Sequence, residues 1–186
     1  MSDPSDDLAL AGAARLLPRA GREAIRATLE GRDPAVDIEP RGLLATAAPV
    51  FVTLRIHGEL RGCIGSMVAL CDNVVDETVD RACAAAFDDP RFPPLTLEEL
   101  DATSVEVSIL RPLQPVASRD ELDPVRFGIE VRDRGGRRGV LLPEIDGVDT
   151  VERQIEITRR KAGIAPDAEI ELRCFSVVKV PDPDFA

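Results

Sequence analysis

Alternating apolar and polar positions predict strands in the middle of the chain. In residues 50–56 (VFVTLRI) and residues 104–110 (SVEVSIL), every second side chain is apolar, a pattern typical of strands with one buried face. The polar face of the first strand carries Thr53, and that of the second carries Glu106. Residues 170–180 predict a last strand, which contains Cys174.

Two hairpins are predicted from turn residues between apolar segments. Residues 57–59 (HGE) separate the first strand from residues 60–64, and Gly135-Gly136 separates residues 127–131 from residues 139–142. Each pair of segments is therefore expected to form an antiparallel pair.

The length of the first turn decides which way Cys63 faces, because a shift of one residue exchanges the two faces of a strand. With an odd number of turn residues, Cys63 lies opposite Arg55 and shares a face with Arg61 and Thr53. With a two-residue turn, Cys63 pairs with Leu54 and is buried. We expect the odd turn, since it keeps Arg61 out of the core.

Three helical segments are predicted. Residues 6–29 have helical periodicity that Pro18 divides into two pieces, and residues 150–162 form a helix that ends at Gly163. Residues 73–87 form the third, with Asp72 as its cap. Its buried stripe is expected to contain Val75, Val79, Cys83 and Ala86.

The order of helices, hairpins and a closing strand predicts an α+β protein with a mainly antiparallel sheet flanked by helices. A chain of 186 residues is long enough for one domain, and we expect residues 1–186 to form a single domain with residues 1–8 disordered. Residues 88–95, which contain three prolines, cannot continue a helix and are expected to form a loop.

Charge and composition narrow the functional classes. The net charge of -11 disfavours nonspecific nucleic-acid binding, which relies on clustered cations. No apolar segment is long enough to cross a bilayer, and the acidic N-terminus is unlike a signal peptide, so a cytoplasmic location is expected. Lysine occurs only at Lys161 and Lys179. This acidity with little lysine leads us to expect a halophilic source.

The segment LRGCIG, residues 60–65, contains the most plausible reactive thiol. A neighbouring guanidinium favours the thiolate form of Cys63, and Gly62 and Gly65 allow close approach of a ligand or a second backbone. The alternative is a structural cysteine, because unpaired cysteines are usually buried. The single histidine, His57, falls in the turn, so a cysteine–histidine dyad lacks its usual base.

Cys71, Cys83 and Cys174 complete the set of four cysteines, whose spacing fits neither a metal site nor a disulfide framework. We therefore expect reduced thiols and no bound metal. Motifs for nucleotide or dinucleotide binding are also missing from the sequence, so the identity of any cofactor stays unknown.

Six short motifs, in the same order along the chain, resemble the AMMECR domain family, also called AmmeMemoRadiSam system protein A. The resemblance as a whole extends from about Arg22 to Phe175. The motifs are residues 51–54 (FVTL), 60–66 (LRGCIGS), 89–95 (DPRFPPL), 105–108 (VEVS), 141–143 (LLP) and 161–163 (KAG). The sequence departs from the family by lacking aromatic residues near Asp149–Val151 and Ala168–Leu172.

The resemblance implies a larger and a smaller lobe with LRGCIG lining the cleft between them. It also implies companion proteins of the Memo and radical S-adenosylmethionine families. The expected candidates are Cys63 and Glu106 for catalysis and, for substrate binding, Thr53, Arg61, Gly62, Gly65, Asp89 and Arg91. An ion pair between Arg61 and Glu106 is the structural alternative for these two residues.

The leading hypothesis is an intracellular protein that binds or modifies a polar, anionic substrate at Cys63. If the protein is an enzyme, its activity depends on this cysteine. The alternatives are a noncatalytic scaffold that docks a partner and, less favoured by the charge, an RNA-binding module. The sequence does not indicate an oligomeric state.

Overall fold

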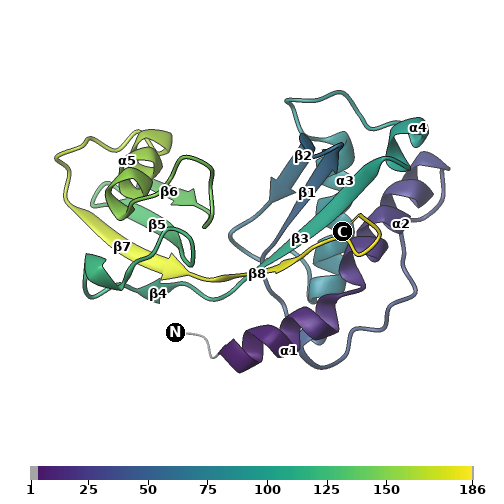
Figure 1. The fold of residues 1–186 in the computed structure, drawn as a ribbon, viewed down its shortest axis with the longest axis horizontal. Helices are drawn as coiled ribbons and strands as arrows, with labels where there is room; N and C mark the ends of the chain where they lie inside the picture. Colours follow the sequence, from purple (N-terminus) through teal and green to yellow (C-terminus); the bar gives the residue numbers. More distant parts are fainter. Residues whose placement is uncertain (1–3, 186) are drawn as a thin grey trace. The chain divides into compact units, whose positions relative to one another are not determined.

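The computed structural model describes residues 4–185, and the side chains of residues 4–8 are outside this description. Part of the segment expected to be disordered, residues 1–3, therefore lies outside the described residues. The chain divides into two compact units: the first contains residues 4–110 and 178–185, and the second contains residues 111–177. The architecture is α+β, with helices and two four-stranded antiparallel sheets, as predicted (Figure 1).

The first unit contains one sheet, with strand order β2-β1-β3-β8, and the helices that pack on it (Figure 1). Its elements are α1 (Pro4–Ala14), α2 (Leu17–Leu29), the 3-10 helix η1 (Gly42–Ala45), β1 (Val50–Ile56), β2 (Glu59–Gly65), α3 (Val74–Phe87), α4 (Leu97–Leu100), β3 (Thr103–Leu110) and β8 (Val177–Val180). One face of the sheet packs on α2 and α3 through a core that includes Val52, Leu54 and Val107. We call the opposite face the outer face.

The helices of the first unit follow the sequence pattern with two corrections. The predicted break in the first segment is confirmed, because Pro18 lies in the first turn of α2, where a missing N–H is tolerated. The cap of α3 is Asn73 rather than Asp72, and its side chain accepts a hydrogen bond from the Asp76 N–H. Cys83, expected in the core, is only half-buried.

The hairpin of β1 and β2 corrects the expected turn. The turn has two residues, His57 and Gly58, whose φ angles of 52° and 85° are both positive, as in the tight turns that match strand twist. A bulge at Leu54/Arg55 then shifts the register, so that Cys63 pairs with Thr53 and not with Arg55. Because of the bulge, Cys63 lies on the same face of the sheet as Thr53, as was expected from a turn with an odd number of residues.

The second unit contains the other sheet, with strand order β4-β7-β5-β6. Its elements are β4 (Gln114–Pro115), the 3-10 helix η2 (Arg119–Glu121), β5 (Gly128–Asp133), β6 (Arg138–Leu141), α5 (Val151–Lys161) and β7 (Ile170–Phe175). The second hairpin is confirmed by the pairing of β5 with β6. The helix ending at Gly163 is confirmed too, with Thr150 as its N-cap and a φ of 64° at the glycine.

The last strand is not continuous, which corrects the prediction of one strand over residues 170–180. It is interrupted at Ser176, and its two parts, β7 and β8, belong to different sheets. Alternation along a segment does not reveal this change of partner, because either sheet presents the same pleated surface.

Candidate functional site

Three polar side chains form a row across the outer face of the first sheet. Thr53 on β1 pairs with Cys63 on β2 and with Glu106 on β3, and all three residues are half-buried. The Thr53 hydroxyl lies 3.4 Å from the Cys63 sulfur, within hydrogen-bond distance. We call Cys63, Thr53 and Glu106 the polar row.

The geometry of the polar row separates the thiol from the carboxylate. Adjacent strands lie about 4.8 Å apart, so the backbones at Cys63 and Glu106, two strands apart, are separated by about 10 Å. Thr53 stands between them. The two candidate catalytic residues therefore share a face but do not form a contact pair, and a ligand of several atoms is needed to touch both.

Arg61 makes a different ion pair from the expected one. Its guanidinium donates from Nε and Nη2 to the Glu99 carboxylate at 2.9 and 3.0 Å, and from Nη2 to the Pro93 carbonyl at 3.0 Å. The Glu106 pairing considered from the sequence is therefore wrong. The Arg61 side chain is 11% exposed and fastens the proline-rich loop to β2.

Sequence reasoning missed Glu99, although a signal was present. Thr96 and Glu99 form a capping box at the start of α4, the T-x-x-E pattern that marks a helix N-terminus. The same carboxylate receives the Arg61 guanidinium, and this hydrogen bonding, first of all, holds the pKa of Glu99 below its ordinary value. The capping box was readable from sequence, whereas its pairing with Arg61 was not.

Asp89 and Arg91 close the edge of the sheet beside Cys63. The Asp89 carboxylate accepts the Cys63 backbone N–H at 2.8 Å, and the Arg91 guanidinium donates to the Cys63 carbonyl at 3.3 Å. Because β2 is an edge strand, these backbone groups have no neighbouring strand on that side. The two side chains therefore occupy the place of a further strand and link the LRGCIG and DPRFPPL motifs.

The same two side chains bind one another. Arg91 donates from Nε and Nη2 to Asp89 at 2.9 and 2.6 Å. This paired contact is the main reason that the pKa of Asp89 lies below its ordinary value, and it raises the pKa of Arg91. The Asp89 side chain is 2% exposed but that of Arg91 is 53% exposed, so only the guanidinium is accessible to a ligand.

The two glycines of the motif permit close packing within the protein. A Cβ atom at Gly62 would lie 2.2 Å from the Ala85 carbonyl oxygen of α3, and one at Gly65 would lie 2.2 Å from the ring of Phe51. The expectation that these positions allow a second group to come close is therefore met by a helix backbone and an aromatic ring.

In the part of the chain that the structure describes, neither His57 nor the other three cysteines are strand partners of the polar row. His57 is exposed at the hairpin turn. Burial, first of all, raises the pKa values of Cys71, Cys83 and Cys174. Among the described residues, no group of three His, Cys, Asp or Glu side chains is arranged to hold a metal ion, and no helix is long and apolar enough to span a membrane.

Glu77 is a second residue that sequence reasoning missed. Its side chain is fully buried in α3, and Oε2 accepts the backbone N–H groups of Leu70 and Cys71 at 2.7 and 2.8 Å. It thereby holds the loop that follows LRGCIG. An acidic residue in the first turn of a helix is a common feature that favours the helix dipole, so the sequence did not reveal this further role.

The fold and site define an α+β protein with a cysteine on the outer face of an antiparallel sheet, beside a loop fastened by two arginines. Residues 18–180 match the AMMECR1 family, and the chain belongs to this family.

Three relatives show how widely the similarity extends. A Thermotoga maritima protein is 48% identical over 140 residues, which cover 74% of this chain and 80% of that protein. A Clostridium acetobutylicum relative, Protein CA_C1420, is 38% identical over 130 residues, covering 70% of this chain but 27% of that protein. The crystal structure of uncharacterized protein PH0010 from Pyrococcus horikoshii is similar with a TM-score of 0.75 and 32% identity, over 88% of each chain.

Proposed function

We propose that the polar row binds a small polar, anionic substrate and that any modification of it depends on the Cys63 thiol. The observation that carries the proposal is the shared register of Cys63, Thr53 and Glu106 across three adjacent strands. Three different polar groups on one half-buried face form a surface that a ligand can contact at several points.

Each residue has a distinct role in this proposal. The exposed part of the Arg91 guanidinium attracts the anionic end of the ligand, and the Thr53 hydroxyl lies beside the thiol to orient it. Glu106 accepts a hydrogen bond from the other end, about 10 Å away across two strand spacings. Arg61 and Asp89 position the loop and contact no ligand themselves.

The expected setting is the cytoplasm, in a pathway shared with Memo-family and radical S-adenosylmethionine proteins. A shared pathway accounts for a binding surface without a histidine base, because companion enzymes then supply part of the chemistry.

Alkylation of Cys63 by a neutral and an anionic reagent tests the proposal. Iodoacetamide and iodoacetate differ in charge but form the same bond to sulfur, and peptide mass spectrometry separates Cys63 from the three other cysteines. We expect Cys63 to react faster than Cys71, Cys83 and Cys174, whose pKa values are raised by burial. The rate ratio of iodoacetate to iodoacetamide reports the local preference for an anion.

The variant Arg91→Ala should lower this ratio at Cys63 by about 1.4- to 5-fold, since an exposed charge interaction is worth roughly 0.2–1 kcal/mol. Arg32→Ala, in the turn that follows α2, is the matched control and should leave the ratio unchanged. A Cys63 that neither reagent modifies in the folded protein contradicts the proposal.

A noncatalytic scaffold is the second candidate, and one observation favours it: both arginines near Cys63 already bind carboxylates of the same chain. If the protein is a scaffold, the Cys63 side chain has a packing role only, and the variant Cys63→Ser binds the same partners as the wild type. An RNA-binding module is the third candidate. Its test is RNA binding at increasing salt, where electrostatic recognition must weaken.

A further inference from the structure

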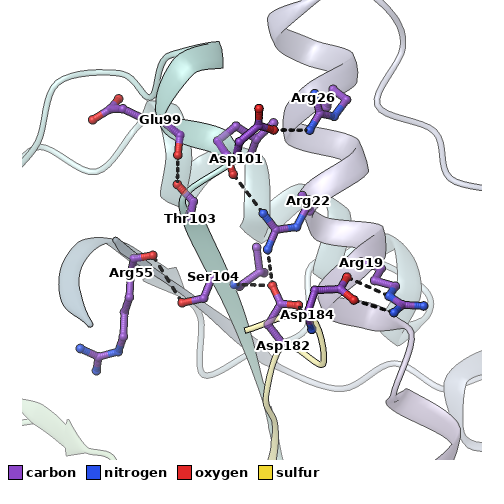
Figure 2. Close-up of polar contacts among 12 residues, drawn as sticks. Arg19, Arg22, Arg26, Arg55, Glu99, Asp101, Thr103, Ser104, Asp182 and Asp184 are labelled. Atoms are coloured by element: carbon purple, nitrogen blue, oxygen red, sulfur yellow. Dashed lines mark hydrogen bonds and ion pairs between the residues drawn. The ribbon is translucent and has the colours of Figure 1, made fainter. Parts of the chain in front are cut away.

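The C-terminal segment of the chain, residues 181–185, is bound on the surface of α2 by two arginines. Arg19 and Arg22 lie three residues apart and therefore on the same face of the helix (Figure 2). Both point toward the segment Pro181-Asp182-Pro183-Asp184-Phe185, defined here as the acidic tail.

The outer contact of the acidic tail is a paired hydrogen bond. Arg19 donates from Nε and Nη2 to the two oxygens of Asp184 at 3.0 and 2.7 Å. This two-point geometry is specific for a carboxylate, because both planar groups must be aligned. It holds the pKa of Asp184 below its ordinary value and raises that of Arg19.

The inner contact is buried and resembles a built binding site. The Asp182 side chain is 2% exposed, and its Oδ2 accepts a hydrogen bond from Arg22 and another from the Val105 backbone N–H at 3.0 Å. Arg22 is fixed in turn by the Leu100 carbonyl at 3.0 Å. A carboxylate placed here thus meets donors that the folded protein already holds in position.

The aromatic residue of the tail completes the recognition. The Arg22 guanidinium lies over the ring of Phe185, 4.5 Å from its centre, a cation–π contact. The two prolines restrict the backbone between these contacts and reduce the entropy lost on binding. Asp182 and Asp184 therefore bind different arginines. Phe185 contacts Arg22, the arginine that also binds Asp182.

The tail also lies just after the part of the chain that matches the family, which ends at residue 180. We propose that Arg19 and Arg22, together with the Val105 N–H, form a binding site for peptide segments of the type Asp-x-Asp-Phe, occupied here by the chain's own acidic tail. The partner is a protein that carries such an acidic segment with an aromatic residue, and it competes with the tail for the site.

Peptide binding to a shortened chain tests this site. The variant ends at Val180, and the probe is a fluorescent peptide with the sequence of residues 181–186, followed by anisotropy. We expect the shortened chain to bind the peptide and the full chain to bind at least about tenfold more weakly, because the tethered tail occupies the site at a high effective concentration. Equal binding to both chains overturns the proposal.

Matched variants of α2 locate the binding. In the shortened chain, Arg22→Ala should weaken binding about tenfold or more, as expected for a hydrogen bond to a charged group. Arg26→Ala is the control, since Arg26 on the same helix binds Asp101 and not the tail (Figure 2). A peptide with asparagine for both aspartates should not bind, and equal loss in the two arginine variants contradicts the assignment.

The folding and the oligomeric state of the shortened chain provide two further tests of the site. If the shortened chain is unfolded, the peptide is titrated into it and folding is followed by circular dichroism; a gain of structure that depends on peptide concentration supports the site, and no gain overturns it. If the full chain is a dimer that becomes monomeric on shortening, the same site binds the tail of a second copy, which supports the recognition chemistry.

Discussion

Replacing Asp89 by asparagine separates the roles of shape and charge where the two motifs meet. Asp89 is 4% exposed and accepts hydrogen bonds from the Cys63 N–H and from the backbone and guanidinium of Arg91. Asparagine keeps the shape, but its amide nitrogen cannot accept a hydrogen bond. The substitution therefore removes the charge and leaves donors on one side without an acceptor.

The magnitude follows from the exposure of the partners. A hydrogen bond to a charged group contributes roughly 1.5–3 kcal/mol when buried, but Arg91 is half-exposed and can turn to water. We therefore expect Asp89→Asn to lower the free energy of unfolding at pH 7 by about 2 kcal/mol. In a chain of this length, each kcal/mol shifts Tm by roughly 2–4 °C, so Tm should fall by about 4–8 °C.

The lowered pKa of Asp89 determines how its contribution to stability changes with pH. The folded pKa of Asp89 is lowered, chiefly by Arg91, so its contribution is present above the unfolded pKa of about 3.9 and is lost as the pH falls from there toward the folded pKa. The stability difference between wild type and Asp89→Asn should thus shrink from pH 7 to pH 3.

Urea unfolding followed by circular dichroism at pH 7, 5, 4 and 3 measures this difference. Asp101→Asn is the control, because Asp101 is highly exposed and pairs only at the surface with Arg26; it should change stability by less than about 1 kcal/mol at every pH. A stability difference for Asp89→Asn that stays constant down to pH 3 would refute the reasoning.

Three further predictions concern packing, a buried carboxylate and salt. Gly62→Ala should lower the free energy of unfolding by about 1–3 kcal/mol, because its Cβ atom would lie 2.2 Å from the Ala85 carbonyl oxygen. Gly12→Ala in α1 should raise the free energy of unfolding by about 0.5–1 kcal/mol, because its Cβ atom would meet no other atom within 4 Å. Thermal unfolding compares the two, and a fall for both contradicts the packing argument. Glu77→Gln should speed proteolysis within residues 66–73, because the buried carboxylate holds this loop; unchanged cleavage in a time course speaks against that role. The excess of acidic residues should make Tm rise in molar KCl, and equal Tm with and without KCl rules out the halophile hypothesis.

Local patterns predicted the elements with the strongest periodicity. The strand over residues 50–56 and the helix ending at Gly163 were readable because alternation and capping act within one segment. The turn of the first hairpin was misjudged by one residue, and the bulge at Leu54/Arg55 compensated for it. The bulge has no distinct sequence signature here. The sequence therefore predicted the correct face for Cys63 but the wrong cross-strand partner, Arg55 instead of Thr53.

The partners of charged residues were the least predictable part of the site. Arg61 binds Glu99 and not Glu106, although both carboxylates lie within the same stretch of sequence. Arg22 binds Asp182, 160 residues further along the chain. Such pairs depend on which strands and helices lie side by side, and no periodicity within a segment encodes that.

The sequence by itself determined most of the strands and helices, the apolar face of β1 and β3, and the presence of LRGCIG and DPRFPPL in the order typical of the family. The tertiary structure decided the rest: the row of Cys63, Thr53 and Glu106, the closure of the β2 edge by Asp89 and Arg91, and the binding of the acidic tail to α2. The physical reason is that alternation fixes the orientation of a side chain relative to its own strand. Its neighbours are fixed only when the register between strands and the packing of helices are set.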